Sequence, residues 1–253
     1  MDADGFVEVV GTSTNGFNRP QSLGNFAKND SRSNSKKTKT KTSIRPANGG
    51  KKDTSDEPKK SATTSFLEPQ VCGTKAKNIF KEYIVGGDIN DAILSIDELI
   101  GAGEQGSVER GAKVLESSIF MVMEMKAQDV EKILPVIIRC YTEKKIEQAS
   151  FIAGLNDPLE FLNDIAIDAP LASTHLATIF ASFVKAGAIK FDHLLIAPEF
   201  FRTDSNAAAF GAKALKAMGG DAATEAANVE VIEKLMTDED QSKHSSAKNL
   251  IAA

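Results

Sequence analysis

The chain has few cysteines, and it has no long apolar run. Its 253 residues include only two cysteines, Cys72 and Cys140, so a disulfide framework is not expected and a reducing, cytoplasmic compartment is favoured. No segment approaches the roughly 20 consecutive apolar residues that a membrane-spanning helix needs. The acidic N-terminus, MDADGFVEVV, lacks a positively charged segment followed by an apolar stretch, which argues against a signal peptide.

Residues that carry catalysis or bind metals are also scarce. The three histidines, His175, His193 and His244, have no His or Cys partner at ligand spacing, so no metal or cofactor is expected. No nucleophile signature or Ser/His/Asp constellation is present. GAGEQGSV, residues 101–108, matches the phosphate-binding pattern G-x-G-x-x-G, but the preceding residues have helical period and no kinase motif follows. We therefore predict a loop between helices there, and a protein that is not an enzyme.

Positive charge is concentrated near the N-terminus. Residues 28–61 hold eleven Lys or Arg and four acids, a charge of +7, so with a net charge of -5 the rest of the chain carries -12. This stretch has almost no apolar residues, and we interpret residues 1–73 as a disordered basic arm. Weak contact with mRNA phosphates is one function of such an arm, and a solvated linker is the other, because aromatic residues for stacking on bases are missing. The candidate RNA contacts are Lys36, Lys37, Lys39, Lys41, Arg45, Lys51 and Lys52.

Helical periodicity begins after the arm and predicts an all-α fold over residues 74–218. The first predicted helix ends before Gly86 and Gly87, and the second starts after Asp88, which is a favourable N-cap. Four further helices are predicted over residues 108–125, 129–145, 146–167 and 170–187. Pro135 predicts a kink or break in one helix, and Pro158 an interruption in the next. Two shorter helices follow, and residues 219–253 form an acidic, Ala-rich tail with one helix over 228–236. Short loops between amphipathic helices favour antiparallel pairs in an α-solenoid or bundle.

Two segments, GGDINDAILSIDELI and GLNDPLEFLNDIAIDAPLASTHLATIFASFVKAGAI, resemble the MA-3 domain over about residues 75–200. The family recurs as a G-D-x-x-E/D-A helix start, a D-I/L-x-I/L-D-x-P junction and a helix that ends in x-A/Q-G-x-I/L. The matching residues are Asp88 and Ala92, then Asp164, Ile165, Ile167, Asp168 and Pro170, then Ala186, Gly187 and Ile189. Asp91 stands where the family more often has Glu.

This resemblance implies a fold of atypical HEAT-like helix pairs and a role in binding proteins. MA-3 domains occur in eukaryotic translation initiation factor 4 gamma and in programmed cell death protein 4, where they bind the DEAD-box RNA helicase of the cap-binding complex. The acids of the D-x-x-x-D-x-P junction make that contact, so the resemblance implies Asp164, Asp168 and Pro170 as the binding site. DADGFVEV also resembles a segment upstream of the domain in initiation factor 4 gamma, so we expect the C-terminal portion of such a scaffold, or a short relative.

The spacing of the two aspartates is itself informative. Like charges four residues apart cost a helix a few tenths of a kcal/mol, so the pair needs a compensating role. Asp168 is a candidate N-cap for the helix predicted from Pro170, whereas Asp164 is free to face an arginine cluster of a partner. The leading hypothesis is a helicase-binding adaptor in translation initiation. The alternatives are an RNA-binding or ribosome-associated accessory protein that acts through the basic arm, and a translational repressor of the same fold.

Overall fold

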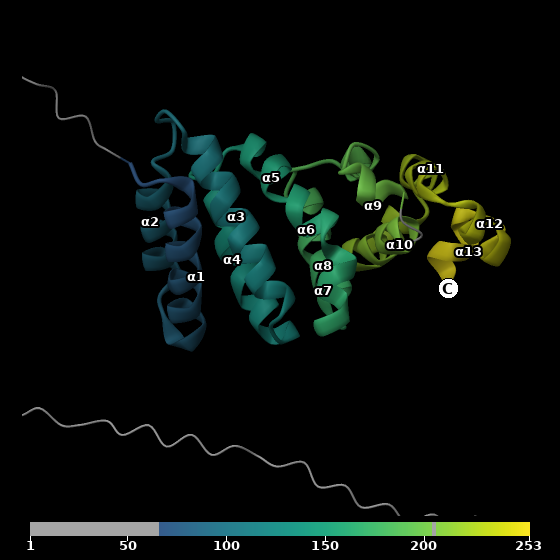
Figure 1. The fold of residues 1–253 in the computed structure, drawn as a ribbon, viewed down its shortest axis with the longest axis horizontal. Coiled ribbons are helices and arrows are strands. Elements are labelled where there is room, and N and C mark those ends of the chain that lie inside the picture. Colours follow the sequence, from purple (N-terminus) through teal and green to yellow (C-terminus); the bar gives the residue numbers. More distant parts are fainter. Residues whose placement is uncertain (1–65, 204–205) are drawn as a thin grey trace, which may run out of the picture. The chain divides into compact units, whose positions relative to one another are not determined.

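The computed structural model describes residues 66–203 and 206–253, and every regular element within these ranges is a helix (Figure 1). The helices stack in chain order as an α-solenoid, which confirms the all-α fold class. The seven candidate RNA contacts lie outside the described residues. So does the basic arm up to residue 65.

The first two helix pairs are α1 (Pro69–Gly86) with α2 (Ile89–Ile100), and α3 (Ser107–Met123) with α4 (Ala127–Thr142). Only Gly87 and Asp88 separate α1 from α2, so the two helices run antiparallel. The arm was predicted to extend to residue 73, and this is wrong at its end. α1 already begins at Pro69, a residue favoured in the first turn, and Cys72 is completely buried.

A kink or a break was predicted at Pro135, and of these two the break is absent, because α4 continues through the proline as one helix. Proline in a helix interior removes one backbone hydrogen bond and costs about 3 kcal/mol. Pro135 is exposed, but the apolar residues on both sides of it are buried: Ile133, Leu134, Val136 and Ile137. Their burial, at about 1.5–3 kcal/mol each, outweighs the cost of the proline and keeps α4 as one helix.

The helix predicted over 146–167 is three short helices, α5 (Gln148–Gly154), α6 (Asn156–Glu160) and α7 (Leu162–Asp168). Pro158 lies inside the first turn of α6, where a missing backbone N–H has no partner to lose, so the interruption falls before it at Leu155. The next helix, α8 (Ala172–Lys185), stops where predicted. Gly187 is left-handed with φ of 75°, and the N–H of Ala188 donates to the Phe183 carbonyl.

Two shorter helices were predicted after α8. The structure has η1 (Phe191–Leu195) and α9 (Glu199–Thr203) in place of the first, and α10 (Ala207–Met218) as the second. Residues 219–253, predicted as a tail with one helix, form η2 (Gly220–Ala223), α11 (Ala226–Leu235), α12 (Asp238–His244) and α13 (Ala247–Ala252). At Gly211 of α10 an added Cβ would lie 2.4 Å from Cδ1 of Ile232, so α11 packs directly against the backbone of α10. The prediction of one short helix in a tail is therefore wrong.

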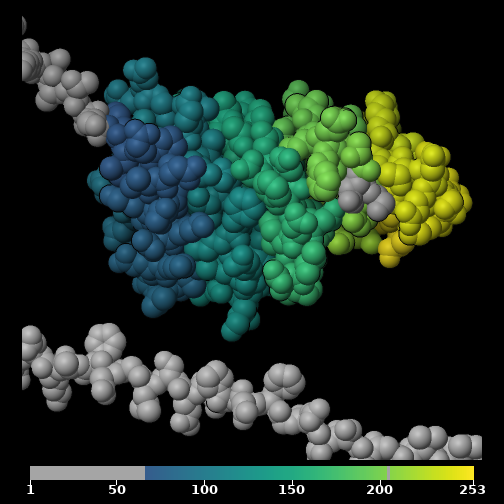
Figure 2. Space-filling model, in the orientation of Figure 1, coloured from purple at the N-terminus to yellow at the C-terminus, as the bar shows by residue number. Residues whose placement is uncertain are grey.

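A chain of edge-to-face aromatic contacts connects the middle of the stack to its C-terminal helices. The ring centroids of Phe151 and Phe183 are 4.8 Å apart, and those of Phe180 and Phe210 are 6.0 Å apart. Phe210 in turn contacts Phe201 of α9 at 5.5 Å. The buried apolar side chains between Cys72 and Ile251 form one hydrophobic core. Figure 2 shows the described residues following one another in chain order across one continuous body.

Candidate functional site

The predicted aspartate pair lies on α7, a helix of two turns. Leu162 is buried and Ile165 is half-buried against the core, which fixes the helix by its apolar side. Asp164 and Asp168, four residues apart, are both exposed. Residues at this spacing lie one above the other on a helix, so both carboxylates stand on the same outer side of α7.

The junction from α7 to α8 does not use Asp168 as a cap. Asp168 is the last residue of α7, and Ala169, Pro170 and Leu171 separate it from the first residue of α8. The N-cap position is Leu171, with helical backbone angles and no side-chain hydrogen bond. The prediction that Asp168 caps this helix is wrong, because the intervening turn takes its side chain away from the free N–H groups.

The two aspartates border a surface hollow of about 700 Å³, which we call the acid groove. One wall is the turn between α3 and α4, and the other is the α7–α8 junction. Its acids are Asp164, Asp168 and Glu124, and its apolar lining is Met123, Met125, Ile165, Ala169, Pro170 and Leu171. The predicted site residues Asp164, Asp168 and Pro170 are thus brought together, and Glu124 joins them from a distant part of the sequence.

The carboxylates of the acid groove have no cationic partner in the described part of the chain. No Lys or Arg lines the groove, and no side-chain hydrogen bond or ion pair of Glu124, Asp164 or Asp168 is present among the described residues. Some acids outside the groove do have a cationic partner, as in the 2.6 Å ion pair between Lys145 Nζ and Asp97. Three unpaired acids beside exposed apolar side chains, including Leu171 at 57% exposure, suit a partner surface with cationic and apolar groups.

The wall formed by the α3–α4 turn is held by a buried histidine. His175 is 4% exposed, and its Nδ1 lies 3.3 Å from the carbonyl oxygen of Met123. This contact joins α8 to the end of α3 at Met123, a residue that lines the groove. His175 therefore supports this wall of the groove from the core side.

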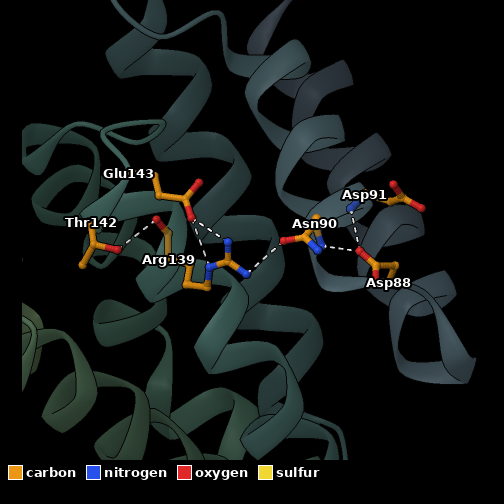
Figure 3. Close-up of polar contacts among 6 residues, drawn as sticks. All are labelled: Asp88, Asn90, Asp91, Arg139, Thr142 and Glu143. Carbon is orange, nitrogen blue, oxygen red and sulfur yellow. Dashed lines mark hydrogen bonds and ion pairs between the residues drawn. The ribbon is translucent and has the colours of Figure 1, made fainter.

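The helix start that matches the first family element is built as predicted. The carboxylate of Asp88 accepts hydrogen bonds from the backbone N–H groups of Asn90 at 2.7 Å and Asp91 at 3.4 Å (Figure 3). The side-chain oxygen of Asn90 also accepts from Arg139 of α4 at 3.2 Å, and Arg139 pairs with Glu143. Figure 3 shows this network joining the start of α2 to the end of α4, so its role is structural.

The other candidates have structural roles. The G-x-G-x-x-G stretch is a loop between α2 and α3, with Gly101, Gly103 and Gly106 in left-handed conformations, as predicted. Burial raises the pKa of the Cys140 thiol to about 12, and burial also raises the pKa of the Cys72 thiol, so neither is a ready nucleophile. Among the described residues no cluster of His, Cys, Asp or Glu has the arrangement of a metal site.

Residues 72–190 match the model of the MA3 domain family, the MA-3 domain of the sequence resemblance. The chain contains an MA3 domain. MA3 domains are helical protein-interaction domains linked to translation factors, and the family is not a catalytic one. No curated protein and no solved structure matches the chain. No helix in residues 66–203 and 206–253 is long and apolar enough to cross a bilayer.

Sequence reasoning found the α7 wall of the groove in this MA3 domain but missed the opposite wall. Glu124 lies forty residues before Asp164, and nothing in its local sequence, VMEMK, marks it as a binding residue. Of the methionines near it, Met121 and Met123 are buried, whereas Met125 is half-buried and lines the groove.

Proposed function

We propose that this MA3 domain binds a DEAD-box RNA helicase of the cap-binding complex through the acid groove, and that the chain acts as an adaptor in cap-dependent translation initiation in the cytoplasm. The observation that supports this most strongly is the position of Asp164 and Asp168. They are unpaired among the described residues, one helical turn apart, and on the rim of an apolar hollow.

The groove suits a cluster of arginines on the partner. A guanidinium group donates two parallel hydrogen bonds to a carboxylate, and such charge-assisted bonds are about twice as strong as neutral ones. The apolar lining from Met125, Ile165 and Leu171 removes water from these contacts when the partner closes over it. Glu124 on the opposite wall adds a third acid. A partner that enters the groove therefore needs one positive group that faces Asp164 and Asp168 and another that faces Glu124.

An adaptor of this kind acts by shifting the conformation of the helicase. The groove must bind one arrangement of the helicase domains more tightly than the other, because a ligand with equal affinity for both shifts nothing. A scaffold and a repressor would use the same groove with opposite results. Stimulated unwinding in a helicase assay supports the scaffold, and inhibited unwinding supports the repressor.

The test is binding of the full chain to the purified helicase. Asp164→Lys replaces an attraction by a repulsion and leaves a partner arginine unpaired, so we expect a loss of roughly 2–4 kcal/mol, or about 30- to 1,000-fold in affinity. Glu131→Lys, at an exposed acid of α4 outside the groove, is the matched control and should change affinity by less than about threefold. Wild-type affinity for Asp164→Lys would overturn the proposal.

RNA binding through the basic arm is the second candidate function, and the +7 charge of residues 28–61 favours it. Such binding would weaken steeply with salt and have little sequence preference. Replacing the seven candidate RNA contacts by glutamine should abolish RNA retention but leave helicase affinity unchanged. If helicase affinity falls instead, the arm rather than the acid groove carries the protein interaction.

A further inference from the structure

A second groove lies on α1 and α2, the first helix pair of the stack. Two hollows, of about 470 and 120 Å³, share the residues Ile79, Glu82 and Ser95, so they form one continuous depression along the pair, which we call the end groove. No helix of the described residues precedes α1. The stack therefore leaves this depression without a neighbouring helix on its N-terminal side.

The floor of the end groove is apolar. Leu67, just before α1, lines the groove, and its side chain is 39% exposed. Ile79 of α1 is half-buried and Leu99 of α2 is buried, and both line the groove. Apolar side chains at these positions offer a partner buried contact area in addition to charge.

The rim of the end groove is acidic. Glu82 stands on the α1 side, and Asp91 and Glu98 stand on the α2 side, with Lys75 as the only cation among the lining residues that the structure describes. None of these three acids forms an ion pair or side-chain hydrogen bond within the described ranges. Asp97, the neighbour of Glu98, faces the other way and pairs with Lys145.

The spacing of the rim acids indicates the kind of occupant. Asp91 and Glu98 are seven residues apart, which is two helical turns and about 10 Å along α2. A helix lying parallel to α2 would meet them with two cationic residues at the same seven-residue spacing. Its apolar side chains on the turn between would point to Ile79 and Leu99. RNA does not suit this surface, because the rim would repel its phosphates.

We propose that the end groove docks a basic amphipathic helix of a partner protein. The partner helix continues the stack by one element, with lysines or arginines on Asp91 and Glu98 and a third cation facing Glu82. The arrangement follows the common mode in which an amphipathic helix lays its apolar stripe into a groove between two helices. The end groove shares no lining residue with the acid groove, so this surface does not depend on the proposed helicase contact.

The test uses the full chain and a labelled synthetic helix that carries two lysines two turns apart with leucines between them. A peptide with glutamates in place of the lysines is the control ligand. In fluorescence anisotropy at low salt, Glu98→Lys and Asp91→Lys should each weaken binding by at least about tenfold, and Leu67→Ser by a smaller factor. Glu131→Lys and Asp164→Lys, which lie outside the end groove, should bind the peptide as the wild type does.

Several results would overturn the proposal. Failure of the wild-type chain to bind the lysine peptide is the plainest. Equal losses in Glu98→Lys and Glu131→Lys would show only general attraction to an acidic body. If replacing Lys51, Lys52, Lys59 and Lys60 by glutamine tightens peptide binding about tenfold, the chain's own arm is the occupant and no partner helix is needed. Thermal melts of each variant confirm that a lost signal reflects binding and not unfolding.

Discussion

The starts of α2 and α8 both follow an aspartate, yet only one of the two aspartates caps its helix. Asp88 has an extended backbone, with ψ of 137°, and its carboxylate accepts two backbone hydrogen bonds of α2. Asp168 is still helical as the last residue of α7, and three residues separate it from α8. An aspartate thus has a structural role at the start of α2, whereas the aspartate before α8 has an exposed carboxylate without a cap role.

This difference shows that a capping residue is defined by its backbone. An aspartate close in sequence to a helix start reaches the free N–H groups best from the N-cap position itself, where the chain leaves the extended region and enters the helix. At the α7–α8 junction that position belongs to Leu171, whose side chain cannot accept a hydrogen bond. The start of α8 therefore forgoes a side-chain cap, and the two acids before it remain exposed on the acid groove.

The largest expected effect comes from reversing both charges of the α7 pair. We expect Asp164→Lys with Asp168→Lys to weaken helicase binding by about 4 kcal/mol, which is less than the sum of the two single losses, because both carboxylates face one arginine cluster. Asp91→Lys at the other junction should leave helicase affinity unchanged. Isothermal titration of the single and double variants checks this, and strictly additive losses would mean that the two acids contact separate groups.

A slightly smaller effect, on stability, tests whether the helices on both sides of the two junctions unfold together as one core. Ile232 of α11 is completely buried against α10, so Ile232→Ala should lower the free energy of unfolding by about 3 kcal/mol. The melting temperature should fall by roughly 6–12 °C in a single transition. Val85→Ala, at 89% exposure, is the control with almost no effect. Two separate transitions in circular dichroism would show that the C-terminal helices fold as their own unit.

The groove wall opposite α7 should contribute less to binding. Glu124→Lys is expected to lower helicase affinity by roughly 1–2 kcal/mol, because this acid is exposed and solvent screens part of its attraction. Its melting temperature should stay within about 2 °C of the wild type. Titration beside Glu131→Lys measures the difference, and identical affinities for the two variants would remove Glu124 from the site.

The smallest effect compares the two junctions directly. Asp88→Ala should cost about 1 kcal/mol of stability, since it removes a cap with two hydrogen bonds. Asp168→Ala should change stability by less than about 0.5 kcal/mol, since no cap is lost. Urea denaturation of both variants in parallel resolves this difference, and equal losses would show that Asp168 stabilises the start of α8 after all.

Local chemistry predicted many of the helix ends of this chain. Asp88 as a cap and Gly187 as a helix stop were both confirmed, because each depends on the side chain and the few backbone groups beside it. A break at Pro135 and a C-terminal tail with one helix were two alternatives that the structure contradicts. In both cases the deciding term is burial against other helices, which outweighs the local cost of a proline or the weak propensity of an acidic, Ala-rich segment.

For the acid groove, the sequence by itself determined that two aspartates stand one helical turn apart before a proline, and family resemblance marked them as a contact. Only the tertiary structure decided that Asp168 is not a cap, that Glu124 faces the pair, and that Met125 and Leu171 line the space between them. The physical reason is range. Capping and turn preferences act over a few residues, whereas a groove needs two walls about forty residues apart in sequence, and packing of α3 against α8 through His175 brings them together.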